Sequence, residues 1–131
     1  MRSTLAAATL ILLTAGFSLA QMQRVDAPRA AMLAETVAGL MILDLRTPGE
    51  FSSGSLNDAV NIDYYGSNFK AQIAELPRET PYLIYCRSGR RSGGTLEFMR
   101  SEGFKEVYHL EGGVLAWRRA GLPLHRPLNS P

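Results

Sequence analysis

Cys86-Arg87-Ser88-Gly89-Arg90-Arg91-Ser92 is the stretch of this 131-residue chain that decides its fold and its chemistry. The apolar run 82–85 leads directly into the cysteine, and helix-forming residues follow the last arginine. This order predicts a strand, a short cationic loop and the first turn of a helix. Arginine charge and a helix N-terminus lower the pKa of a thiol, and successive loop N–H groups bind anions. The stretch therefore predicts a nucleophilic cysteine, Cys86, in an anion-binding loop.

A cysteine after an apolar strand can also be a small buried apolar residue. The residues that follow Cys86 argue against this alternative. No apolar residue occurs until Leu96 and no acid until Glu97, whereas three arginines precede them. Because buried charges must be paired, the sequence favours an open anion site over a packed turn.

Composition and charge indicate one small domain. The net charge is only +2 and the positive charge of the loop is local, so nothing points to nucleic-acid binding. The two histidines and the single cysteine do not cluster with acids, so no metal site is expected. A monomer is the default expectation for a domain of this size.

The N-terminal segment 1–20 predicts a secretory signal peptide. Residues 1–4 are short and basic, residues 5–17 are apolar, and Ser18-Leu19-Ala20 places small residues at the positions that a signal peptidase reads. Cleavage after Ala20 is expected to leave a periplasmic protein with no stable membrane association. The alternative is an uncleaved anchor, but the apolar stretch is short for a membrane span of about 20 residues. A single cysteine cannot form an internal disulfide in an oxidising compartment, which suggests that Cys86 is used.

Strand and helix patterns alternate along the rest of the chain. Residues 21–39 are expected to form a polar lead-in and a first helix, residues 40–121 the main domain, and residues 122–131 a Pro-rich tail with little to pack against. The expected strands are 41–45, 59–62, 82–85 and 106–110, and the expected helices are 30–40, 67–76, 91–101 and 114–120. This alternation predicts an α/β fold, a small parallel β-sheet flanked by helices on both faces.

The residues at the carboxyl ends of the predicted strands form a second pattern. Ligand sites in parallel α/β folds lie at those ends. Cys86 follows one strand, and Asp44 and Arg46 follow another. We expect Asp44 and Arg46 to support neighbouring loops through hydrogen bonds and an ion pair. Glu50 is interpreted as a helix-start residue, and His109 as a structural histidine with its hydrogen bonds satisfied.

Three blocks, in this order, resemble the rhodanese sulfurtransferase family. They are Asp44-Leu45-Arg46-Thr47-Pro48-Gly49-Glu50-Phe51, the loop 86–91, and Leu110-Glu111-Gly112-Gly113-Val114-Leu115-Ala116-Trp117. The resemblance covers about residues 40–120. The chain departs from the family pattern at Gly54-Ser55-Leu56, where many members have Gly-His-Ile, and at Gly93-Gly94, where alanines are more usual.

The resemblance implies a thiosulfate sulfurtransferase that needs no metal and no organic cofactor. Cys86 would carry a persulfide and pass its outer sulfur to cyanide or a thiol. The backbone N–H groups of Arg87, Ser88, Gly89, Arg90 and Arg91 would surround the sulfur. Arg87 and Arg90 would attract the anionic donor, and Arg91 would close the loop.

Three other functions would also use Cys86. Phosphatases and arsenate reductases of related fold have a loop one residue longer, and Ser92 occupies the position where their arginine would stand; phosphatase activity is therefore disfavoured. A persulfide carrier that serves a partner protein needs the same loop and stays open. A thiol-redox sensor is disfavoured because the chain has no resolving cysteine.

Overall fold

The structure, a computed structural model, describes residue 11 and residues 19–128. Most of the predicted signal peptide, 1–20, lies outside the described residues. Five strands form one sheet in the order β1-β5-β4-β2-β3, and every neighbouring pair is parallel. The elements in chain order are β1 (Gln21–Val25), α1 (Ala27–Thr36), β2 (Met41–Asp44), α2 (Pro48–Ser52), β3 (Val60–Asn61), α3 (Phe69–Ala74), β4 (Tyr82–Tyr85), α4 (Arg90–Ser101), β5 (Glu106–Leu110) and α5 (Gly113–Arg119).

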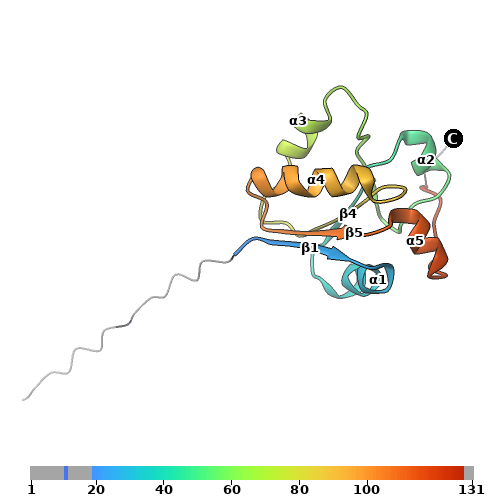
Figure 1. The fold of residues 1–131 in the computed structure, drawn as a ribbon, viewed down its shortest axis with the longest axis horizontal. Coiled ribbons are helices and arrows are strands. Elements are labelled where there is room, and N and C mark those ends of the chain that lie inside the picture. The colour runs from blue at the N-terminus through green and yellow to red at the C-terminus, as the bar shows by residue number, and fades with distance from the viewer. Residues whose placement is uncertain (1–10, 12–18, 129–131) are drawn as a thin grey trace, which may run out of the picture.

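The sheet is covered on both faces, which confirms the predicted α/β architecture. In Figure 1, α1 and α5 lie on one face, and α3 and α4 lie on the other. Side chains of β4 alternate between two apolar clusters: Leu83 and Tyr85 point toward α1 and α5, whereas Tyr82 and Ile84 point toward α3 and α4. All four β4 residues are buried, as expected for the central strand of a parallel sheet. The strand that leads into Cys86 is therefore among the best-packed parts of the fold.

The polar lead-in expected at 21–29 is in fact a strand and the start of a helix. Residues Gln21–Val25 form β1, which pairs along its whole length with β5 at one edge of the sheet. Gln21 and Arg24 are exposed and only Val25 is fully buried, so the segment carries little of the apolar pattern that marks a central strand. Asp26 then caps α1 by accepting a hydrogen bond from the Arg29 N–H at 2.9 Å.

The C-terminal tail also differs from its prediction, because residues 122–125 pack against the domain. The backbones of Ser55 and His125 exchange two hydrogen bonds of 2.8 Å. The Trp117 indole N–H donates to the Pro123 carbonyl at 2.9 Å. Leu122 and Leu124 pack against the apolar cluster on the α1 and α5 side of the sheet. No helix in the described ranges is long and apolar enough to cross a membrane.

Candidate active site

The loop 86–91 connects the C-terminal end of β4 to the N-terminus of α4, as predicted. Gly89 caps α4 in a left-handed conformation (φ 97°), which reverses the chain without a side-chain cap. The first turn of α5 lies against the other side of the loop. The Val114 N–H donates to the Cys86 carbonyl at 2.9 Å, and the Leu115 N–H donates to the Arg87 carbonyl at 3.1 Å. The loop is therefore anchored by two helices.

Gly113 makes this anchoring possible. A Cβ on Gly113 would lie 2.4 Å from the Cys86 carbonyl oxygen and 2.5 Å from that of Arg87. Its φ of 57° is also unfavourable for residues with a side chain. The Gly112-Gly113 pair is thus part of the loop's construction, since any larger residue would push the cysteine backbone away from α5.

Hydrogen-bond donors surround the Cys86 sulfur. Cys86 is fully buried, and its Sγ accepts from the Gly89 N–H at 3.2 Å and from the Ser92 N–H at 3.5 Å. The Ser92 hydroxyl donates to the same atom at 3.4 Å. This is the arrangement that a negatively charged sulfur requires.

These donors decide the ionisation of the thiol. Burial raises the pKa of Cys86, but the Ser92 hydroxyl and the N–H groups of Ser92, Gly89 and Arg91 lower it by more, so the pKa lies below its ordinary value. A lowered pKa increases the fraction of thiolate near neutral pH, and the thiolate is the nucleophile.

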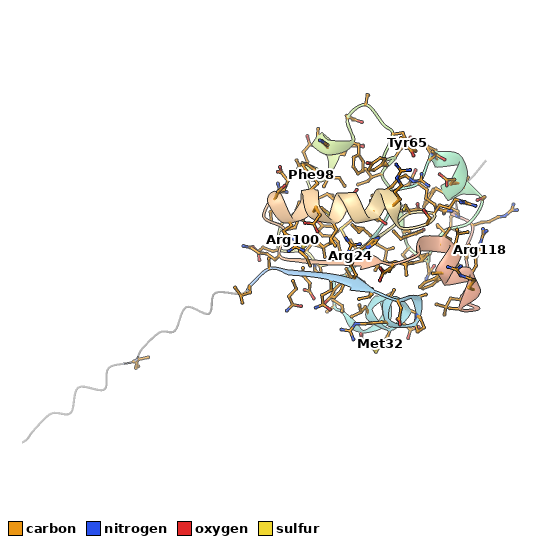
Figure 2. All side chains as sticks on the ribbon, viewed as in Figure 1. Arg24, Met32, Tyr65, Phe98, Arg100 and Arg118 are labelled. Carbon is orange, nitrogen blue, oxygen red and sulfur yellow. The ribbon has the colours of Figure 1, made fainter. Side chains whose placement is uncertain are left out.

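The guanidinium of Arg91 pairs with a carboxylate on another helix rather than with the Cys86 sulfur. It makes a two-pronged ion pair with Glu50 of α2, with Nη1–Oε2 and Nη2–Oε1 distances of 3.0 Å. Its guanidinium also lies 5.5 Å from the centre of the Tyr65 ring, and Figure 2 shows Tyr65 on the segment before α3, toward α2. Arg91 therefore ties the loop to α2.

Glu50 has a larger role than the predicted helix-start residue. Its carboxylate also completes a capping box with Thr47. Hydrogen bonds from Arg91, partly opposed by burial, together with those from Thr47 lower the pKa of Glu50 to about 2. Glu50 is thus ionised at neutral pH and holds Arg91 in place.

The other loop side chains face solvent. Arg87, Ser88 and Arg90 are exposed, and no ion pair of Arg87 or Arg90 occurs within residues 19–128. Their charges are available to an approaching anion, where Arg87 and Arg90 were expected to act.

Asp44 and Arg46 form the expected ion pair, with an Nη2–Oδ2 distance of 2.7 Å, and both are buried. Arg46 also donates to the Gly54 carbonyl at 2.6 Å. The Tyr85 hydroxyl donates to Asp44 at 2.6 Å and accepts from the Leu56 N–H at 3.0 Å. This network joins β2, β4 and the segment 54–56 on the face opposite α4, so it supports the loop without reaching the sulfur.

Two residues beside the loop have features that the sequence did not predict. Ser92 marked only the length of the loop in the sequence, yet its hydroxyl contacts Sγ; a serine in the first turn after the loop is the signal that could have revealed it. His109 was expected to have its hydrogen bonds satisfied. That expectation is wrong: the ring is buried and its Nε2 has no hydrogen-bond partner in the described structure.

Known proteins resemble the chain in both sequence and fold. The model of the Rhodanese-like domain family matches residues 29–120. A sulfurtransferase of Allochromatium vinosum is 34% identical over 88 residues, which are 67% of this chain and 80% of that protein. The probable adenylyltransferase/sulfurtransferase MoeZ of Mycobacterium tuberculosis is 31% identical over 84 residues, which are 64% of this chain but 21% of MoeZ.

Solved structures agree with the sequence comparison. A rhodanese-related protein of Thermoplasma volcanium superposes with a TM-score of 0.68 at 28% identity, covering 80% of this chain and 99% of that one. The fold and the site together define a parallel α/β domain that presents a cysteine in a loop whose N–H groups point at its sulfur. The chain belongs to the Rhodanese-like domain family.

Proposed function

We propose that this chain is a thiosulfate sulfurtransferase that acts through a persulfide on Cys86. The observation that carries the proposal is the hydrogen-bonded Sγ, whose lowered pKa favours the thiolate. Membership of the family and the sulfurtransferase relatives support sulfur transfer in general. Thiosulfate as donor, and cyanide or a thiol as acceptor, are the specific part of the proposal.

The geometry of the loop supports the following chemistry. The Cys86 thiolate attacks the outer sulfur of thiosulfate; a new S–S bond forms while the S–S bond of thiosulfate breaks, and its electron pair leaves with sulfite. Loop N–H groups stabilise the anionic sulfur, and Arg87 and Arg90 offset the charge of the departing sulfite. Cyanide then attacks the outer persulfide sulfur, forms thiocyanate and restores the thiolate. The proposed cycle uses no metal or organic cofactor.

We further propose that the mature protein is a periplasmic monomer. The signal-like sequence of residues 1–20 supports export. The start of β1 at Gln21 is compatible with cleavage after Ala20, because such cleavage would remove no residue of the sheet. Analysis of the N-terminus of protein recovered from the periplasm tests the cleavage after Ala20, and a retained segment 1–20 would refute that cleavage.

A persulfide carrier that serves a partner protein is the second candidate. The match to one fifth of MoeZ supports it, because there a similar domain is part of a longer protein named for two activities. Initial rates of thiocyanate formation over a range of thiosulfate concentrations separate the candidates. Saturation with a KM below about 1 mM, in the ordinary range for enzymes, favours the enzyme; no saturation at far higher concentrations favours the carrier. Cys86→Ser should abolish the activity in either case, and an active C86S variant would refute both.

A further inference from the structure

His109 lies directly beneath the active-site loop. It is the fourth residue of β5 and is 1% exposed. A Cβ on Gly89 would lie 3.6 Å from His109 Nε2, and one on Gly93 would lie 3.7 Å from Cε1. The imidazole therefore fills the space between the sheet, the loop and the first turn of α4.

Arg24 fixes the protonation of this ring. Arg24 lies opposite His109 on the neighbouring strand β1, and Figure 2 places it on the α4 side of the sheet. Its Nη1 is 3.3 Å from His109 Nδ1. Because a guanidinium can only donate, Nδ1 must accept, and the proton of the neutral imidazole is on Nε2.

Burial and the adjacent charges keep the ring neutral. Burial is the larger cause of the lowered His109 pKa, and the positive charge of Arg24 is the second; the Gly89 backbone and Glu111 oppose them. His109 therefore presents one Nε2–H group near the loop. The Gly89 backbone is close enough to act on the ring, but Nε2 makes no hydrogen bond of ordinary geometry within the described residues.

Gly89 lies beside this N–H group, and it also contacts the sulfur. The Gly89 N–H donates to Cys86 Sγ, while its carbonyl accepts from the Gly93 N–H at 2.9 Å. A donor beneath Gly89 can fix the orientation of both groups, since they share one α-carbon. An unpaired buried N–H is costly, and hydrogen bonds at an empty catalytic site often tighten only when the reacting state forms.

We propose that His109 is a positioning residue for the Cys86 loop. Its Nε2–H hydrogen-bonds the Gly89 carbonyl when Cys86 becomes a thiolate or a persulfide, and this holds the Gly89 N–H against the sulfur. Arg24 selects the required tautomer. Gly93 adjoins this pair, since a Cβ there would meet Arg24 Nη1 at 3.4 Å, an ordinary contact distance.

Two amides test the role by mimicking different ring nitrogens. His109→Gln places an N–H donor near the position of Nε2, whereas His109→Asn places polar atoms only near Nδ1. The readout is the rate of Cys86 alkylation by iodoacetamide as a function of pH in the full domain. The positioning role of His109 rests on the proposed function, in which Cys86 is the nucleophile. Alkylation of Cys86 needs no sulfur donor, so the proposal for His109 and the proposal of sulfur transfer can fail separately.

We expect H109N to move the midpoint of the profile to higher pH and to slow alkylation below the midpoint by about threefold, the effect of a modest hydrogen bond. H109Q should retain the wild-type profile. The same pair of substitutions at the exposed His125 is the matched control and should change nothing. Equal profiles for H109N and H109Q, whether both shifted or both unchanged, would overturn the proposal.

A measurement on the unaltered protein covers the case in which H109N does not fold. Two-bond ¹H–¹⁵N spectra resolve the tautomers of the two histidines. His109 should be the Nε2–H tautomer and should stay neutral to a lower pH than an ordinary imidazole does. An Nδ1–H tautomer or an imidazolium at neutral pH would refute the role assigned to His109.

Discussion

The Ser92 hydroxyl offers the most direct way to perturb the thiolate. Ser92 is fully buried and contributes a hydroxyl at 3.4 Å and an N–H at 3.5 Å to Cys86 Sγ. Ser92→Ala removes only the hydroxyl, because the N–H belongs to the backbone. A hydrogen bond to a charged group contributes about 1.5 kcal/mol at the low end of its range, and 1.36 kcal/mol corresponds to one pKa unit or a factor of ten. Removing a donor from the charged form raises the pKa of Cys86, so the thiolate fraction below the midpoint should fall about tenfold.

The assay is again the pH profile of Cys86 alkylation, followed by kcat/KM for thiosulfate. Ser101→Ala is the matched control, since Ser101 is on the same helix but donates to the Phe98 carbonyl, away from the sulfur. S92A should alkylate about tenfold more slowly than S101A below the midpoint and lose a similar factor in kcat/KM. Above the midpoint the two rates should converge. A profile of S92A that coincides with that of S101A would refute the idea that side-chain hydrogen bonding sets the thiol pKa.

The remaining predictions concern the supports of the loop. Glu50→Gln should destabilise the domain by about 1–2 kcal/mol at pH 7. This is less than the free energy that the full pKa shift of Glu50 corresponds to, because solvent screens a side chain that is 29% exposed. The folded-state pKa of Glu50 is lowered from 4.5 to about 2, so this stability is fully present above about pH 4.5 and is lost as the pH falls toward 2. Urea unfolding at several pH values should show the difference in unfolding free energy between wild type and E50Q narrowing over that window. A difference that stays constant with pH would contradict the ion pair with Arg91. Gly113→Ala should destabilise the fold by more than about 3 kcal/mol, because its Cβ would overlap the Cys86 carbonyl at 2.4 Å; a thermal melt like that of the wild type would contradict the close contact. Gly94→Ala should stabilise α4 by about 1 kcal/mol and raise Tm by about 4 °C, since a Cβ there meets nothing within 4 Å; an unchanged or lower Tm would show that the glycine has another purpose.

The centre of the fold could be predicted because its signals are local. Strand β4 is a short apolar run, the loop has an unusual density of arginines, and helix-forming residues follow at once. These three signals place Cys86 at the end of a central strand without any knowledge of distant contacts. Strand β1 could not be predicted in this way. It is an edge strand with one buried residue, and only its pairing with β5 makes it a strand.

The position of the cysteine could be predicted from the sequence, but the residues that support its loop could not. The arginines and Cys86 are neighbours in the chain, whereas Arg91 and Glu50 are 41 residues apart and meet only because α2 and α4 lie at the same end of the sheet. The partner of Arg91 is thus a property of the topology. His109 illustrates the same limit, because its sequence position on a strand does not reveal that the loop leaves Nε2 unpaired.

The measurement that tests the central claim most directly is the intact mass of the purified protein after thiosulfate and then after cyanide. The account predicts the gain of one sulfur atom with thiosulfate, its loss with cyanide, and no gain in Cys86→Ser. A folded wild-type protein with a reduced thiol that gains no sulfur would contradict the proposal that Cys86 takes sulfur from thiosulfate.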